Sequence, residues 1–181
     1  EIEYAMRATK ALGADFLTNE LMDDEDISRV NYFARKNKVK VGYHAHSNNF
    51  GTNVKATDDA WNYALNSFED NFINLDIGHY INVGGNNTGD SLIKFIKNNH
   101  RKICSLHLKD RQFGKNANLA ATDNQIWGLG DTPIDKVLRL IRDNSYKFTA
   151  TIELEYRIPE GSNRVKEVKR CLDYCKKALN S

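Results

Sequence analysis

The stretch VKVGYHAH, residues 39–46, decides how the rest of the chain is interpreted. Successive side chains of a β-strand point to opposite faces, so Val41, Tyr43 and Ala45 share one face while His44 and His46 share the other. The stretch therefore predicts a strand with one apolar face and one ionisable face. A single strand histidine is more often a hydrogen-bonded core residue than a ligand, so the functional interpretation depends on similar strands elsewhere.

Three other β-rich runs divide their side chains in the same way near their carboxyl ends. Their apolar faces carry Ile73 and Leu75, then Cys104, Leu106 and Leu108, then Ile152 and Leu154. Their polar faces carry Asn74 and Asp76, then Ser105, His107 and Lys109, then Thr151, Glu153 and Glu155. We therefore expect one shared polar site at the carboxyl ends of neighbouring strands.

The chain alternates such runs with helical segments, which is typical of parallel βα units. Strands are expected near residues 14–20, 39–46, 73–78, 103–110 and 149–156, and helices near 1–12, 24–37, 57–68, 89–99, 133–144 and 163–179. An open parallel sheet covered by helices on both sides would be apolar on both faces. The polar faces, and a long loop at 110–132 after a strand, instead favour the α/β class as a TIM (β/α)8-type barrel.

Composition limits the classes of partner. The chain has 181 residues, 40% of them hydrophobic and 28% charged, and is expected to form a single domain over residues 1–181. Its formal net charge of +2 comes from interspersed acids and bases, so no basic stripe indicates nucleic acid. No apolar run reaches the roughly 18 residues of a membrane span. The compartment is left open, with the cytoplasm favoured.

Four ionisable residues at the expected strand ends point to a metal. Burying His44, Asp76, His107 and Glu153 together is costly unless a cation or other partners compensate. Mixed imidazole and carboxylate ligands suit zinc, manganese, cobalt or iron and are less typical of calcium or magnesium. We therefore expect one divalent ion as cofactor.

Five motifs taken together resemble those of the xylose isomerase-like TIM barrels, the group of sugar phosphate isomerases and epimerases. They are VGYHAH, LDIGHYINVGG, LHLKD, WGLGDTPID and ATIELE. The resemblance implies that Asp76, His107 and Glu153 bind a catalytic divalent metal. Many members carry a glutamate where this chain has His44, and the HAH sequence resembles an HxH variant of inosose dehydratase-like members. The fourth ligand is therefore His44, His46 or Glu20.

The resemblance also implies which part of the barrel the chain supplies. The five expected strands correspond to strands four to eight, so three βα units, on the order of 80 to 120 residues, are expected before Glu1.

The expected function is that of a metal-dependent sugar isomerase or epimerase, or of a dehydratase or lyase. It would act by removing a proton next to a carbonyl of a sugar, polyol or keto-sugar, with the metal polarising the carbonyl. The candidate bases are His46, Glu155 and Glu153. Lys109 is expected to orient or protonate substrate oxygens, and the further substrate contacts are His79, Trp127 and Glu20. The expected partner is a small sugar or polyol, and a homo-oligomer is possible.

Two alternatives remain. A barrel that lost its chemistry would act as a carbohydrate-binding module, and metal content separates that case from an enzyme. An endonuclease IV-type phosphodiesterase is less favoured, because that branch needs further metal-binding histidines and the loop at 111–131 contains none.

Overall fold

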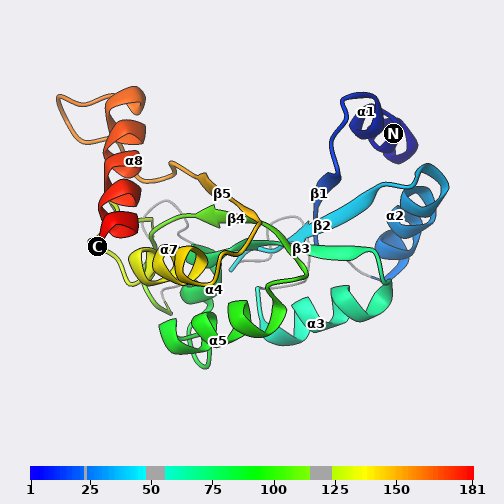
Figure 1. The fold of residues 1–181 in the computed structure, drawn as a ribbon, viewed down its shortest axis with the longest axis horizontal. Coiled ribbons are helices and arrows are strands. Elements are labelled where there is room, and N and C mark those ends of the chain that lie inside the picture. Colours follow the sequence, from blue (N-terminus) through cyan, green and yellow to red (C-terminus); the bar gives the residue numbers. More distant parts are fainter. Residues whose placement is uncertain (23, 48–55, 115–123) are drawn as a thin grey trace.

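The chain forms half of a barrel. The computed structural model describes residues 1–22, 24–47, 56–114 and 124–181. Five parallel strands pair in chain order, namely β1 (Phe16–Glu20), β2 (Lys40–His44), β3 (Asn71–Asp76), β4 (Ile103–Leu108) and β5 (Thr149–Ile152). The sheet curves, as Figure 1 shows, and the predicted α/β, TIM-barrel type of fold with five βα units is confirmed.

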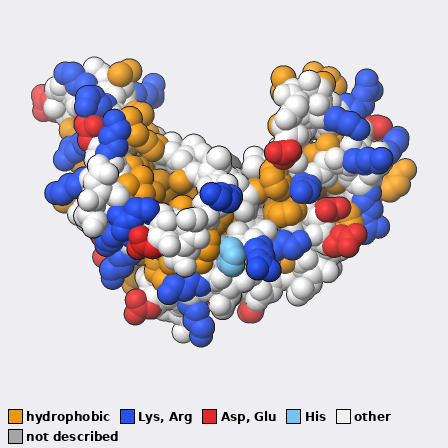
Figure 2. Space-filling view, viewed as in Figure 1, with side chains coloured by type: hydrophobic (Ala, Val, Ile, Leu, Met, Phe, Trp, Pro, Cys, Tyr) orange, Lys and Arg blue, Asp and Glu red, His pale blue; other side chains and the backbone are white. Residues whose placement is uncertain are grey.

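The helices cover the convex face of the sheet and its two ends. They are α1 (Ile2–Ala11), α2 (Asp24–Asn37), α3 (Asp58–Ser67), α4 (Ile77–Val83), α5 (Gly89–Asn99), α7 (Ile134–Asp143) and α8 (Arg164–Asn180). In Figure 1 the open side of the half-barrel lies between α1 and α8. The space-filling view in Figure 2 shows the surface hollowed between these two arms. The inner face of the curved sheet therefore borders this hollow, and Asn74 and Asp76 on that face are buried.

The hydrophobic core lies between the outer face of the sheet and the helices. The outward side chains Tyr43, Leu75 and Leu106 have no exposed surface. Trp61 of α3 and Leu92 of α5 are also fully buried in this cluster. Burying apolar area on one face of the sheet leaves the opposite face for polar residues, which is the division that the strand alternation predicted.

The register aligns the carboxyl ends of the strands. Glu20 of β1 is paired with His44 of β2, and Asp76 of β3 is paired with His107 of β4. The ladder continues one residue past β5, because the Glu153 amide donates a hydrogen bond to the Leu108 carbonyl at 3.0 Å. The sheet thus brings residues far apart in sequence to one edge.

The prediction for residues 73–78 was wrong at both ends. The strand begins at Asn71 and stops at Asp76, where helix α4 begins at once. Asp76 ends the strand because its Oδ1 accepts a hydrogen bond from the His79 amide at 2.8 Å and so caps the helix. Gly78 lets the helix approach β4, since a Cβ there would lie 2.7 Å from the Lys109 carbonyl oxygen.

Cys104 was assigned to the wrong face. The pairing of β3 with β4 shifts between Ile73 and Asn74, which are opposite Ile103 and Ser105 and leave Cys104 as an extra residue. Cys104 Sγ lies so close to Gly42 that a Cβ at Gly42 would collide with it. The irregularity therefore turns the thiol toward the inner face instead of the helices.

Candidate metal centre

Four predicted ligands gather at the carboxyl edge of the sheet. His44 ends β2, Asp76 ends β3, His107 lies one residue before the end of β4, and Glu153 follows β5. Asp76 is fully buried, His44 is 6% exposed, and the side chains of His107 and Glu153 are 27% and 29% exposed. The group is open to solvent on the β4–β5 side and closed around Asp76.

Each of the four presents one buried atom that makes no hydrogen bond within the part of the chain that the structure describes. These atoms are His44 Nε2, Asp76 Oδ2, His107 Nδ1 and Glu153 Oε2. Buried polar atoms are normally hydrogen-bonded, so four such atoms at one place need an explanation. The Lys109 ammonium compensates the two carboxylate oxygens in part, at 3.1 Å and 3.3 Å, and a metal ion between the four atoms would give each of them a partner.

The separations of these atoms suit a common metal ion. Asp76 Oδ2 lies 3.6 Å from His44 Nε2 and 3.9 Å from His107 Nδ1, and His107 Nδ1 lies 3.0 Å from Glu153 Oε2. Two donors bonded to a tetrahedral metal at about 2.1 Å lie about 3.4 Å apart. His44, Asp76 and His107 have ligand atoms within 4.8 Å of one another and fit a divalent ion that takes nitrogen and oxygen ligands, and Glu153 adjoins this group through His107.

A second group, formed by Glu20, His44 and His46, has ligand atoms within 4.8 Å of one another. Here the contacts are already hydrogen bonds. Glu20 Oε1 lies 3.0 Å from His44 Nδ1, and Glu20 Oε2 lies 3.0 Å from His46 Nδ1. One carboxylate therefore orients two rings. If His44 is neutral and donates from Nδ1, its lone pair is on Nε2, which is the atom that faces Asp76.

The opposite charges of His44 and Glu20 stabilise each other. Burial opposes protonation of His44, but the Asp76 and Glu20 carboxylates outweigh it and raise the pKa of His44 to about 9. Burial likewise opposes ionisation of Glu20, but its bonds to His44 and His46 lower its pKa to about 2. Without a metal, His44 is therefore an imidazolium between two carboxylates.

Lys109 lies among three carboxylates. Its Nζ is 3.1 Å from Asp76 Oδ2, 3.3 Å from Glu153 Oε2 and 2.7 Å from Glu155 Oε2, and its side chain is 2% exposed. Burial opposes the charge, but the carboxylates outweigh it and raise the pKa of Lys109. The side chain is thus a buried ammonium that touches two of the four candidate ligands.

His79 lies behind the lysine, at the start of α4. Its Nδ1 accepts a hydrogen bond from the Ser47 amide at 3.1 Å, and its Nε2 is 3.1 Å from Lys109 Nζ. Burial lowers the pKa of His79 well below its usual value, and Lys109 and Arg111 lower it further against the opposing effect of Asp76. His79 is therefore a neutral ring, 2% exposed, that reaches the site through the lysine.

Asn74 and Ser105 were expected on the polar strand faces but not named as site residues, and Asn82 was not expected at the site. Asn74 Nδ2 lies 3.1 Å from His107 Nε2, and its Oδ1 accepts a hydrogen bond from Ser105 Oγ at 2.6 Å. Asn82 Oδ1 accepts bonds from Ser47 Oγ at 2.7 Å and from Arg111 Nη2 at 2.9 Å. Asn74 and Ser105 could have been found from the strand alternation, whereas the Asn82 contacts depend on how loops and α4 fold together.

Trp127 packs within the protein. It is 6% exposed, and its ring lies 6.0 Å from that of Tyr174 of α8 in an edge-to-face arrangement. The following turn is held by Asp110, whose Oδ2 accepts hydrogen bonds from the Gly128 and Gly130 amides. A packing role explains these contacts, and stacking of Trp127 on a sugar stays a prediction.

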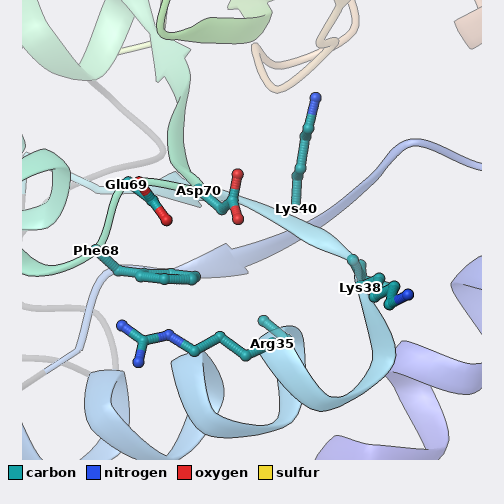
Figure 3. Close-up of a pocket in the computed structure, with 8 residues that line it drawn as sticks. Arg35, Lys38, Lys40, Phe68, Glu69 and Asp70 are labelled. Carbon is teal, nitrogen blue, oxygen red and sulfur yellow. The ribbon is translucent and has the colours of Figure 1, made fainter.

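A pocket lies at the opposite end of β2. It has a volume of about 600 Å³ and lies at the amino end of the strand. Its lining includes five residues that Figure 3 labels, namely Arg35, Lys38, Lys40, Phe68 and Asp70. The Arg35 guanidinium lies over the Phe68 ring at 4.0 Å from the centroid. This end of a barrel contributes stability, and chemistry occurs at the carboxyl end.

Comparisons with known proteins agree with the fold. The family described as xylose isomerase-like TIM barrel matches residues 1–178. No curated protein sequence matches the chain.

No helix among the described residues is long and apolar enough to cross a membrane.

Solved structures of low sequence identity share the architecture. A xylose isomerase domain protein from Planctomyces limnophilus is 17% identical with a TM-score of 0.70, over 98% of this chain and 64% of that one. An IolI protein with a bound zinc atom is 15% identical with a TM-score of 0.64, over 99% and 65%. The 3-keto-D-glucoside 4-epimerase YcjR from E. coli is 14% identical with a TM-score of 0.69, over 97% and 69%.

The chain thus spans less than two thirds of the first two of these structures. Identities this low establish the fold alone, while the family match covers almost every residue. The chain belongs to the xylose isomerase-like TIM barrel family.

Proposed function

We propose that this protein is a divalent-metal-dependent isomerase or epimerase of a keto-sugar or related polyol, with elimination of a β-substituent as a variant of the same chemistry. One observation carries the proposal, namely the convergence of the four buried donor atoms of His44, Asp76, His107 and Glu153 that lack hydrogen bonds among the described residues. Membership of a family whose structural neighbours include sugar epimerases supports the substrate class.

The four donors would hold the ion, and Glu20 and Asn74 would orient the two imidazole ligands from behind. When bound, a divalent ion supplies Lewis-acid polarisation of a substrate carbonyl and its neighbouring hydroxyl. IolI, which shares the fold, is described with bound zinc. Zinc, manganese and cobalt suit this mixed donor set better than magnesium does.

The proton next to the carbonyl would be taken by His46. Its Nδ1 faces Glu20 Oε2 at 3.0 Å, and a neutral ring that donates there keeps its basic lone pair on Nε2. On the other side of Asp76, Glu153 and Glu155 lie beside Lys109. A base on each side suits epimerisation, in which a proton leaves one face of a carbon and returns to the other.

Lys109 and His79 would bind and orient substrate oxygens. The ammonium is the stronger donor because it is charged and 2% exposed, so a hydrogen bond to a developing negative oxygen is worth more there than in water. His79 is neutral and would act by holding the lysine in place. Glu155 is a weaker candidate base than His46, because its Oε2 is already ion-paired to Lys109 at 2.7 Å.

The test is exchange of carbon-bound hydrogen with solvent. Purified protein loaded with Mn²⁺ would be incubated in D2O with ketohexoses, 3-keto-glucosides and inososes, and followed by proton NMR. We expect loss of the proton next to the carbonyl in at least one substrate, and a His46→Gln variant that slows this exchange by about 100-fold or more. An exposed variant, Glu25→Gln, serves as the control.

A protein that binds Mn²⁺ and a sugar but exchanges no proton would contradict this function. That result would support the carbohydrate-binding alternative.

A further inference from the structure

The ammonium of Lys109 lies against the same oxygen atoms that face the candidate metal position. Its Nζ is 3.1 Å from Asp76 Oδ2 and 3.3 Å from Glu153 Oε2. These two oxygens are also two of the four donors that lack a hydrogen bond within the described residues. The Lys109 ammonium and a metal ion would therefore interact with the same two carboxylates.

Lys109 has another carboxylate within reach. Glu155 Oε2 is its nearest partner, at 2.7 Å, and lies on the more exposed side of the site, with 41% of its side chain exposed. Glu155 makes no contact with Asp76 Oδ2, His44 Nε2 or His107 Nδ1 among the ion pairs of the described residues. A small movement of the ammonium toward Glu155 would release the two inner oxygens without leaving the lysine unpaired.

The lysine cannot simply withdraw into solvent. Its side chain is 2% exposed. Helix α4 packs so closely against Lys109 that a Cβ on Gly78 would collide with the Lys109 backbone. Two cations that share buried carboxylates repel each other more strongly than they would in water. Whatever occupies the inner position must therefore displace the lysine locally.

We propose that Lys109 is an internal competitor of the metal ion. In the metal-free protein its ammonium compensates Asp76 and Glu153 as well as Glu155, and metal binding leaves it paired with Glu155 alone, at the mouth of the site. Lys109 can then donate a hydrogen bond to a substrate oxygen only after the metal is bound, so the metal binds before the substrate. This inference rests on the proposed function, since it assumes that the four donors bind a metal.

The test compares Mn²⁺ affinity with and without the lysine. Mn²⁺ alone would be titrated calorimetrically, at one pH and ionic strength, into wild type, Lys109→Met and Lys109→Gln. We expect both variants to bind Mn²⁺ about 10-fold or more tightly than wild type, because a repelling charge is removed. Lys97→Met, which removes an exposed lysine of α5 and the same net charge, should bind as wild type does.

Thermal unfolding supplies a second readout. In EDTA both Lys109 variants should melt below wild type, because Asp76 and Glu153 lose their counter-charge. With saturating Mn²⁺ the difference should shrink, and a variant that unfolds in EDTA should refold when Mn²⁺ is added. Variants that stay unfolded with Mn²⁺ would overturn the inference, since the ligand cluster would then depend on the lysine itself.

The two proposals fail in different ways. Variant affinities equal to or weaker than that of wild type would overturn the competitor role and leave the proposed function standing. Absence of Mn²⁺ binding by wild type and by both variants would overturn both.

Discussion

The two sides of Asp76 differ in their ratio of acidic to basic side chains. On the β1–β2 side, one carboxylate serves two imidazoles, as Glu20 pairs with His44 and His46. On the β4–β5 side, two carboxylates pair with one ammonium and one imidazole. Glu153 contacts both Lys109 and His107, and Glu155 contacts Lys109. Asp76 is the residue that both sides touch.

The difference indicates that the two sides of the site have different chemical roles. A histidine that donates one ring N–H to a carboxylate is a good base at neutral pH, so the β1–β2 side is suited to accept protons. The β4–β5 side is rich in charge and oxygen atoms, so it is suited to bind cations and substrate hydroxyl groups. The predictions below test whether Asp76 joins the two sides and whether Glu20 defines one of them.

The largest effect is expected from Asp76→Asn, which removes the carboxylate common to both sides. Asn keeps an Oδ1 that can still cap α4 by accepting from the His79 amide, so folding should survive. We expect Mn²⁺ binding to fall more than about 100-fold, beyond what changes around a ligand usually cost. Equilibrium dialysis measures this, and a variant that binds metal as wild type does would show that Asp76 is not a ligand.

The next effect is a pH dependence of stability in the metal-free protein. The pKa of His44 is raised from 6.5 to about 9, so its contribution is complete below pH 6.5 and is lost as pH rises through about 9. At about 1.4 kcal/mol per pKa unit, the loss is about 3 kcal/mol. Urea unfolding in EDTA between pH 6 and about 9.5 measures it.

A His44→Gln variant is the control for this pH dependence. It should lack the loss of stability between neutral and alkaline pH. An equal loss in the variant would assign the effect to another group.

The smallest effect is expected from Glu20→Gln. A glutamine keeps one acceptor oxygen and replaces the other with an NH2 donor, so it cannot accept from both Nδ1 atoms where they now lie, and one of the rings should turn or change tautomer. Metal affinity should fall by about 10- to 100-fold, as for other residues that orient metal ligands. Nitrogen NMR of the two rings would detect the altered tautomer, and unchanged spectra with unchanged affinity would show that Glu20 orients neither ring.

Much of this arrangement follows from strand periodicity. Alternation in VGYHAH and in the other strand ends placed His44, Asp76, His107 and Glu153 on one face, and the parallel order brought them to one edge. The same reasoning allowed Glu20 to lie beside His44. These are local properties, so the sequence carries them directly.

Other features depend on contacts that periodicity does not encode. Helix α4 was not predicted, because its apolar residues also fit the end of a strand and its start depends on a cap by Asp76. The shift at Ile73 and Asn74, which turns Cys104 inward, arises from the pairing of two strands. The contact of Lys109 with two candidate ligands likewise required the folded sheet.

The most direct test of the central claim is the location of a bound metal by anomalous diffraction from crystals grown with Mn²⁺ or Zn²⁺. We expect one ion bonded to His44 Nε2, Asp76 Oδ2, His107 Nδ1 and Glu153 Oε2. An ion found instead between Glu20 and the Nδ1 atoms of His44 and His46, the other group close enough to bind one, would contradict it.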